Sequence, residues 1–164
     1  MSRLDSFIRR LQAQRECLAA AARLIRGIDG PVLELGLGNG RTYDHLRSLL
    51  PEREIFAFDR AVNAHPACVP EDDHLVLGEM PDVLAAAQDR LGAPAALAHC
   101  DIGTGDEAAN AVLAYRLGPA LDPLLAPGAV VLSDHALVVS RWYLTPLPPA
   151  VEPGRYFMYR VGGS

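Results

Sequence analysis

Cysteine is scarce in this chain of 164 residues, and its three cysteines are scattered. Cys17, Cys68 and Cys100 form no Cys-x-x-Cys pair, and the five histidines show no His-x-x-x-His spacing. The sequence therefore predicts neither a zinc site nor a disulfide framework, and no residue is assigned as a metal ligand. Reduced thiols and a cytoplasmic location are the interpretation that this pattern favours.

Long apolar runs and an excess of basic residues are missing as well. The most apolar stretch, residues 121–133, contains Asp122 and two prolines and is shorter than the roughly 18–20 residues that cross a bilayer. A net charge of −5 argues against nucleic acid as the main partner, because a phosphate-binding surface normally needs a basic excess. With 50% hydrophobic residues, the chain predicts one globular domain over residues 1–164, with no membrane contact.

A glycine-rich loop follows directly on a short apolar segment. Residues 32–35 predict a strand buried on both faces, as in the centre of a parallel sheet. Gly36 permits a sharp turn with positive φ, Gly38 lets a ligand approach the backbone, and Gly40 allows the next helix to pack closely. That helix, predicted over residues 41–50, presents free N–H groups at its start.

Residues 32–40 resemble the first motif of class I S-adenosylmethionine-dependent methyltransferases, Glu/Asp-x-Gly-x-Gly-x-Gly. Glu34 stands at the acidic position, where a buried carboxylate needs a hydrogen-bond partner, and Asn39 lies inside the loop. The dinucleotide fingerprint Gly-x-Gly-x-x-Gly is an alternative, but it requires glycine where Arg41 stands. A tight turn that binds no ligand is the other alternative.

An acid ends the second predicted strand, residues 54–59. Asp59 follows Glu34 by about two dozen residues, and a carboxylate at this strand end can accept hydrogen bonds from both ribose hydroxyls. The resemblance implies that Asp59 binds the ribose of the cofactor. A helix cap is the structural alternative for this residue.

The third predicted strand, residues 74–77, is followed by Gly78, Glu79 and Met80, and then by a helix predicted over residues 81–91. The resemblance implies that the loop after this strand reaches the adenine. Met80 would press its polarisable side chain on the ring, or it would simply be core. Glu79 or a neighbouring backbone group would accept from the exocyclic amine.

The fourth predicted strand, residues 95–101, also ends in an acid. Asp101 either holds the ammonium group of the cofactor or orients the methyl acceptor, as the resemblance implies. His99 shares its side of the pleat and is either a base or a buried, hydrogen-bonded histidine. Capping of the next helix, predicted over residues 106–117, suits Asp106 better than Asp101.

The N-terminus predicts one long amphipathic helix over residues 3–26, within an N-terminal element of residues 1–28. Arg15 interrupts its apolar stripe. The helix packs on the α/β core, residues 29–164, or it covers the substrate side of the pocket or forms a homo-oligomer contact. The stripe contains Leu4, Phe7, Ile8, Leu11, Leu18, Ala22, Leu24 and Ile25.

The C-terminal region is expected to be abbreviated. Pro127-Gly128 predicts a turn before a strand over residues 129–134, and residues 135–141 leave room only for a loop or a short helix. Two further strands are expected at residues 142–147 and 155–161, where aromatic residues favour β structure. In the first of these, Trp142 and Tyr143 either line an acceptor pocket or pack at the sheet edge.

Alternating strands and helices predict an α/β, doubly wound parallel sheet, whose ligands bind at the carboxyl ends of the strands. The resemblance implies a Rossmann-like sheet of order 3-2-1-4-5-7-6 and SN2 transfer of a methyl group from S-adenosyl-L-methionine. Acidic charge and small size favour a small-molecule acceptor, and no Asn/Asp-Pro-Pro-Tyr-like stretch is present. A non-catalytic S-adenosylmethionine-binding or interaction protein and an NAD-binding oxidoreductase are the alternatives.

Overall fold

The computed structural model describes residues 2–163. Within these residues, four α-helices are interspersed among the first five of seven β-strands, and β6 and β7 follow β5 without a further α-helix. Short 3₁₀ turns occupy residues 66–68, 72–74, 88–90 and 122–124. The helices are α1 (Arg3–Leu24), α2 (Arg41–Leu49), α3 (Asp82–Ala85) and α4 (Glu107–Leu121). The strands are β1 (Val32–Leu35), β2 (Ile55–Asp59), β3 (Leu75–Leu77), β4 (Ala95–Cys100), β5 (Leu125–Ser133), β6 (Trp142–Leu144) and β7 (Phe157–Val161).

All seven strands form one sheet of order β3-β2-β1-β4-β5-β7-β6, which confirms the predicted order. The first five strands run parallel, whereas β7 lies antiparallel between β5 and β6. In this register Glu34 of β1 lies opposite His99 of β4. The carboxyl ends of β1, β2 and β4 therefore meet at one edge of the sheet.

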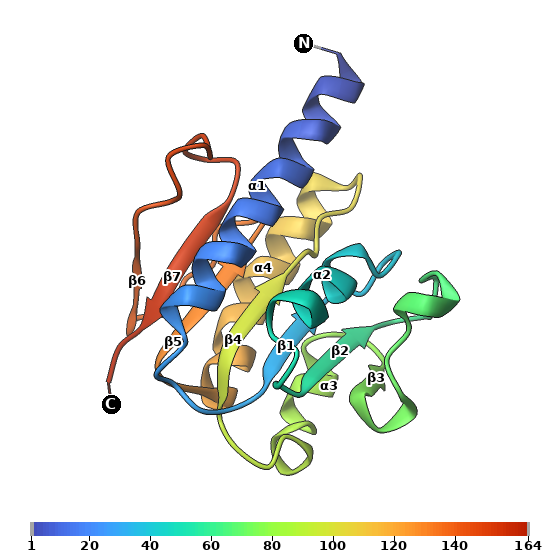
Figure 1. Ribbon diagram of the computed structural model, residues 1–164, viewed down its shortest axis with the longest axis vertical. Coiled ribbons are helices and arrows are strands. Elements are labelled where there is room, and N and C mark those ends of the chain that lie inside the picture. Colours follow the sequence, from blue (N-terminus) through green and yellow to red (C-terminus); the bar gives the residue numbers. More distant parts are fainter. Residues whose placement is uncertain (1, 164) are drawn as a thin grey trace.

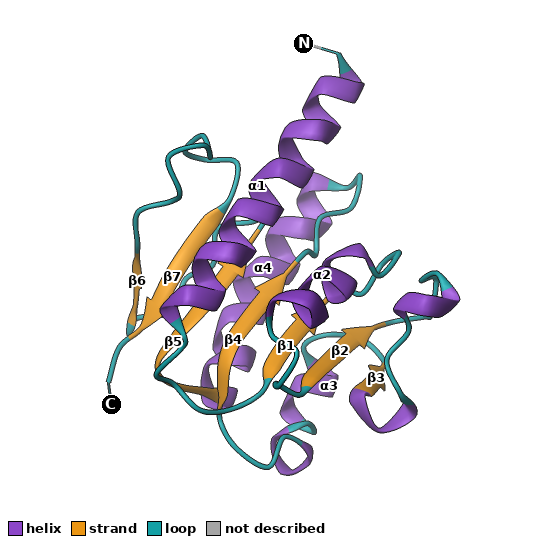
Figure 2. Ribbon diagram, viewed as in Figure 1, coloured by secondary structure: helices purple, strands orange, loops and turns teal. Residues whose placement is uncertain are grey.

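Helices cover both faces of the sheet. In Figure 1, α1 crosses in front of the strands and α4 lies behind them, and Figure 2 shows the strands as a layer between helices. On the α1 and α2 side, Leu18 and Leu46 pack with Leu97 and Val130. On the α3 and α4 side, other side chains of the same strands pack with Leu84 and Leu117. Because successive side chains of a strand point to opposite faces of the sheet, each strand contributes apolar residues to the core on both faces.

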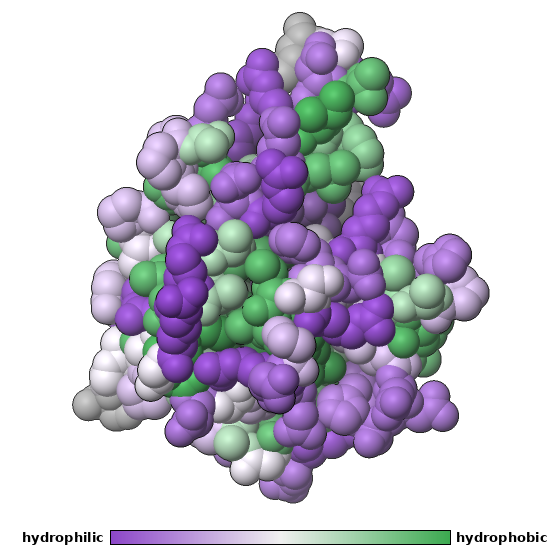
Figure 3. All heavy atoms as spheres, viewed as in Figure 1, coloured by the Kyte–Doolittle hydropathy of each residue, from purple (hydrophilic) through white to green (hydrophobic). Residues whose placement is uncertain are grey.

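The first half of α1 projects beyond the body of the molecule (Figure 1), and its second half packs on the sheet. A capping box of Ser2 and Asp5 begins the helix. Leu4, Phe7 and Ile8 remain partly exposed, and Figure 3 shows apolar side chains gathered on this projecting end. The apolar stripe is therefore divided between a buried half and an exposed half.

The prediction that the stripe passes through residue 15 was wrong. Arg15 points outward and pairs with Glu16 at 3.2 Å, whereas the side chain at the buried position is Gln14. Steps of three and four residues lead from Leu11 through Gln14 to Leu18, so the stripe is continuous but contains one polar member.

Four predicted elements have bounds that differ from the structure by more than two residues. The helix expected over residues 81–91 is only α3 followed by a 3₁₀ turn, where the N–H of Arg90 donates to the carbonyl of Ala87 at 2.9 Å. The turn expected at Pro127-Gly128 is a bulge inside β5, because the register jumps from Ala95 opposite Leu125 to Leu97 opposite Val130.

The other two corrections concern element lengths. α4 continues past the predicted residue 117 to Leu121 with Pro119 inside it, and Asp106 caps it as expected by accepting from the N–H of Ala109 at 3.0 Å. β6 ends at Leu144, two residues before Pro146, which could not donate to a strand ladder. The loop expected between the fifth and sixth strands is present without a helix in it.

No helix among residues 2–163 is both long and apolar enough for a membrane crossing. Within the same residues, no cluster of three or more histidine, cysteine, aspartate or glutamate side chains is arranged to hold a metal ion.

Candidate active site

A cavity of about 500 Å³ opens at the carboxyl edge of the sheet, where the loops after β1, β2, β3 and β4 meet the projecting half of α1 and the start of α4. Of the residues predicted to bind a cofactor, seven line it: Gly36, Gly38, Asn39, Asp59, Glu79, Met80 and Asp101. Three others, Glu34, Gly40 and Gly78, lie outside its wall.

The glycine loop after β1 adopts a backbone conformation that residues with a side chain rarely adopt. Gly36 has φ +91° and a Cβ there would overlap the backbone carbonyl of Asp101, so this glycine is needed for close packing of the loop. Gly38 has φ +52°, but a Cβ there would meet no protein atom within 4 Å. The space beside Gly38 is therefore open to a ligand.

Asp59 is held against the glycine loop. Its Oδ2 accepts from the N–H of Gly38 at 2.9 Å, and its Oδ1 accepts from the N–H of Arg60 at 2.6 Å. A carboxylate has about four lone-pair sites, so both oxygens can still accept from a ligand in the cavity.

Asp101 is tied to the N-terminal helix rather than to the glycine loop. Arg10 donates to its Oδ1 at 2.6 Å and Gln14 donates to its Oδ2 at 2.9 Å. The side chain of Asp101 is 19% exposed, and all three residues line the cavity. Because Arg10 and Gln14 already occupy one site on each oxygen, Asp101 is held in a fixed orientation at the cavity wall.

Glu34 lies beneath the cavity at the centre of a buried chain of polar side chains. Its Oε1 accepts from the hydroxyl of Thr42, and its Oε2 lies 2.6 Å from Nδ1 of His99. On its other side, Nε2 of His99 is hydrogen-bonded to the hydroxyl of Tyr156. Because Thr42 lies in the first turn of α2, Glu34 joins the two ends of the glycine loop, and the partner that its burial requires is present.

The proton affinities in this buried chain are shifted by burial and by neighbouring carboxylates. Burial lowers the pKa of His99, but the charge of Glu34 and its hydrogen bond outweigh burial, so the pKa of His99 is raised. Burial raises the pKa of Tyr156 well above its ordinary value. His99 has both ring nitrogens engaged and no exposed surface, and the cavity wall does not include it. It is therefore a buried, hydrogen-bonded histidine, the second of the two arrangements expected for it.

The remaining predicted residues fall into two groups. Glu79 and Met80 lie in the wall after β3, but a Cβ at the preceding Gly78 would overlap Val83 of α3 rather than enter the cavity. Gly40 begins α2 with φ +82° and packs against Cys68. Gly40 and Gly78 therefore shape the backbone and lie outside the cavity wall.

Trp142 and Tyr143 do not line this cavity. Trp142 is buried and donates its indole N–H to Oδ1 of Asp122 at 2.6 Å, and Tyr143 is largely exposed beside β7. Packing at the sheet edge is thus their arrangement.

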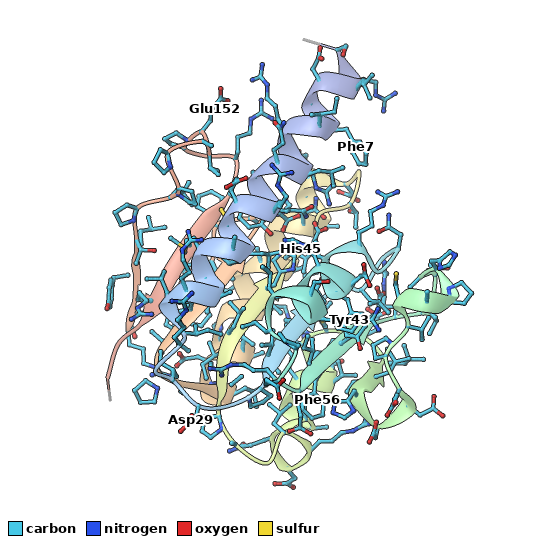
Figure 4. All side chains as sticks on the ribbon, in the orientation of Figure 1. Phe7, Asp29, Tyr43, His45, Phe56 and Glu152 are labelled. Atoms are coloured by element: carbon cyan, nitrogen blue, oxygen red, sulfur yellow. The ribbon has the colours of Figure 1, made fainter. Side chains whose placement is uncertain are left out.

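Sequence reasoning missed the side chains that α1, α2 and α4 supply to the cavity. Phe7 and Arg41 meet across it, with the guanidinium carbon of Arg41 5.9 Å from the ring centre of Phe7, and Figure 4 labels Phe7 on the projecting end of α1. The one usable signal was Gln14, a polar residue at a buried stripe position. The missed residues are Phe7, Arg10, Leu11, Gln14, Leu37, Arg41, Thr42, Arg60, Ile102, Gly103, Thr104, Ala109, Asn110 and Leu113.

Comparisons with solved structures agree with this architecture. A structure from Silicibacter pomeroyi DSS-3, described as an S-adenosyl-L-methionine methyl transferase, has 43% identity and a TM-score of 0.93, and the alignment covers 99% of both chains. The cofactor-bound Rv0187 from MTB has 15% identity and a TM-score of 0.55, with 96% of this chain and 89% of that chain covered.

The MycE methyltransferase of the mycinamycin biosynthetic pathway, solved with Mg and SAH, has 15% identity and a TM-score of 0.52 over 84% of this chain and 42% of that chain. The similarity to Rv0187 and MycE concerns the fold alone.

No curated protein gives a significant match. The sequence profile described as "S-adenosyl-L-methionine methyltransferase" matches residues 1–161. With the whole-length similarity to the Silicibacter protein, this match shows that the chain belongs to the S-adenosyl-L-methionine methyltransferase family and has S-adenosyl-L-methionine as its cofactor.

Proposed function

We propose that residues 1–164 act as one catalytic domain that transfers a methyl group from S-adenosyl-L-methionine to a nucleophile on a small molecule. The observation that carries this proposal is the convergence of Asp59, the glycine loop and Asp101 on one cavity. The nicotinamide alternative is not favoured, because the family match is to methyltransferases and Arg41 replaces the glycine that a dinucleotide site requires.

The chemistry of the cavity wall fits this cofactor. Asp59 offers acceptors for ribose hydroxyls, and Asp101 offers a carboxylate for an ammonium group. Gly38 leaves room for close approach to the backbone, with Asn39 beside it. We assign the adenine end to the wall formed by Glu79 and Met80. Glu34, Gly40 and Gly78 act indirectly, by fixing the loops.

The cofactor supplies a methyl group already activated by the positive charge on its sulfur. The protein therefore has mainly to align donor and acceptor and to exclude water. In this proposal the loops after β1, β2 and β4 orient the cofactor, and the projecting half of α1 covers the cavity. No general base is assigned, because His99 is buried and Asp101 is held by Arg10.

The acceptor side of the cavity has an apolar wall and a positive rim. Phe7, Leu11 and Leu113 supply the apolar surface, and Arg41 lies over the ring of Phe7. A pocket of about 500 Å³ falls in the size range typical of small-molecule sites. These features support a small-molecule acceptor with an apolar portion.

The test is calorimetric titration of the protein with S-adenosyl-L-methionine, beside Asp59→Ala and Gly38→Val variants. We expect binding by the wild type and loss of binding in both variants, with thermal unfolding as the check that each variant is folded. A folded wild type that binds no S-adenosyl-L-methionine would overturn the proposal. Turnover is then measured as S-adenosylhomocysteine formed with a panel of small-molecule acceptors, and consistent failure despite tight binding would favour a non-catalytic binding protein.

Two further proposals concern the setting of the enzyme. The exposed apolar residues Leu4, Phe7 and Ile8 support a homo-oligomer contact through the first half of α1, which light scattering of the wild type and a Leu4→Ser/Ile8→Ser variant would test. A monomeric wild type would exclude it.

The three free cysteines support the cytoplasmic location that we propose.

A further inference from the structure

We propose that Arg10 and Gln14 of α1 form, together with Asp101, the site that binds the amino-acid end of S-adenosyl-L-methionine. The N-terminal helix would thus be part of the cofactor site itself, with Arg10 binding the cofactor's carboxylate. This inference rests on the proposed function, and it adds two residues that the glycine-loop motif does not contain.

The two helix residues are placed to act as a unit. They are four positions apart, so they lie on the same face of α1, one turn from each other. Arg10 and Gln14 contact different oxygens of Asp101, at 2.6 Å and 2.9 Å. Gln14 is only 3% exposed, yet it lines the cavity, so its small accessible surface faces the ligand space.

All three side chains keep unused hydrogen-bonding capacity. A guanidinium has five N–H donors, and among residues 2–163 Arg10 makes a single hydrogen bond, to Asp101. Gln14 uses its amide nitrogen, and its Oε1 has no hydrogen-bond partner within the described residues. Asp101 retains free lone pairs on both oxygens. The group thus presents a carboxylate and an amide oxygen beside a guanidinium.

That arrangement is complementary to a zwitterionic α-amino acid. An ammonium group would donate to Asp101 and to Oε1 of Gln14, and the neighbouring carboxylate would accept from the free N–H groups of Arg10. Guanidinium groups recognise carboxylates through two parallel hydrogen bonds, which a single exposed ammonium side chain cannot reproduce.

The position of the group in the sheet supports the same ligand. Asp59 ends β2 and Asp101 follows β4, with β1 between them, so the backbones that carry the two carboxylates are two strand spacings, or about 10 Å, apart. Only the glycine loop lies in between. S-adenosyl-L-methionine carries its ribose and its amino-acid group on opposite sides of the sulfur, so one molecule can reach both carboxylates across the loop.

A purely structural explanation for the Arg10–Asp101 pair is weak. The second half of α1 is already anchored by buried Cys17, Leu18 and Ala21. The Arg10 side chain is 47% exposed, and partly exposed ion pairs contribute little to folding stability.

The decisive experiment compares two ligands that differ only in the amino-acid end: S-adenosyl-L-homocysteine and 5′-methylthioadenosine. Both are uncharged at sulfur and share the adenosine part. We expect Arg10→Ala to weaken S-adenosyl-L-homocysteine binding by about 10- to 100-fold, the equivalent of a lost charge-assisted hydrogen bond, and to leave 5′-methylthioadenosine binding within twofold. Gln14→Ala should show the same selectivity, and Arg10→Lys should restore part of the affinity.

Two controls separate the possible causes. Arg9→Ala removes the adjacent arginine, which pairs with Glu152 at 3.4 Å on the side of α1 away from Phe7 (Figure 4), and it should affect neither ligand. Asp59→Ala should weaken both ligands equally, because both contain the ribose. If Arg10→Ala weakens both ligands equally, or weakens neither, the inference is wrong although the proposed function stands. If the wild type binds neither ligand, the proposed function fails first and this inference with it.

Discussion

Nδ1 of His99 lies 2.6 Å from Oε2 of Glu34, and both side chains are completely buried between neighbouring strands. The contact continues to Thr42 in one direction and to Tyr156 in the other. It therefore connects the residue before β7, two central strands and the first turn of α2. This connection holds the two ends of the glycine loop. Substitutions that break it should therefore lower the stability of the protein and weaken ligand binding in the cavity.

Replacing His99 by leucine should lower the free energy of unfolding by roughly 3–5 kcal/mol, because it leaves the Glu34 carboxylate buried without a compensating charge. Urea denaturation of the wild type and the variant measures this directly. Tyr156→Phe is the matched control: it removes one hydroxyl and should cost only about 1–3 kcal/mol. A His99→Leu variant as stable as the wild type would show that the His99–Glu34 pair does not contribute this free energy of unfolding.

The His99–Glu34 pair also predicts a pH dependence of stability. The pKa of His99 is raised in the folded protein, through Glu34 at contact distance and Asp101 and Asp134 nearby, against the opposing effect of burial. The folded state therefore binds this proton more tightly than the unfolded state. The resulting stabilisation is complete below about pH 6.5, the ordinary histidine pKa, and is lost as the pH rises through the folded value.

The difference in unfolding free energy between the wild type and His99→Gln should accordingly shrink as the pH rises above about 6.5. Comparing the two proteins removes the contribution of His74, whose pKa is also raised, by hydrogen bonds to Asp73 and Glu54 that outweigh burial. A difference that stays constant across this range would contradict the assignment of the proton to His99.

Substitution by alanine should lower stability more at Gly36 than at Gly38, although both glycines belong to the same loop. Gly36→Ala places a Cβ against the carbonyl of Asp101 in a strained backbone, and should cost roughly 2–5 kcal/mol of stability. Gly38→Ala meets no neighbour, so it should cost only about 1–2 kcal/mol of backbone strain. Thermal unfolding and S-adenosyl-L-homocysteine titration together test this: Gly38→Ala should fold well and bind at least about tenfold more weakly. Equal stabilities would be inconsistent with the packing at Gly36.

The three thiols should differ sharply in reactivity. Burial raises the pKa of Cys17 to about 12, with a smaller contribution from Glu16, and burial raises the pKa of Cys100 well above its ordinary value. Cys68 is partly exposed. Since the thiolate is the reacting species, iodoacetamide at pH 8 should modify only Cys68 in the native protein and all three residues in urea. Mass spectrometry identifies the sites, and native labelling of Cys17 or Cys100 at the rate of Cys68 would refute the prediction.

The parts of the site that could be predicted from sequence are those encoded locally. The glycine loop and the acids at strand ends are contiguous signals, and a parallel sheet brings its strand ends together. Glu34 could be recognised as a buried carboxylate in need of a partner, but the partner could not be named from its neighbours in sequence. His99, 65 residues further along the chain, reaches Glu34 through the pairing of β1 and β4, and Tyr156, 122 residues beyond Glu34, contacts His99 in turn.

The contribution of α1 was hidden for a different reason. On a helix, positions 14 and 15 are one residue apart but point about 100° from each other, and the apolar pattern led to a stripe through residue 15 rather than 14. Only the packed sheet decides that Gln14 faces inward and Arg15 outward. The short α3 likewise reflects tertiary context, since an isolated helix of that length is marginal.

The placement of β7 between β5 and β6 has a consequence for how the chain is made. Synthesis delivers α1 before β5 and β7, which help to bury its second half through Val130 and Met158. Until Val161 has left the ribosome, β5 has an unpaired edge and α1 lacks part of its packing surface. A nascent chain stalled before β7 should therefore aggregate and be digested easily, and release of β7 should complete the packing of the sheet and of α1 in one event.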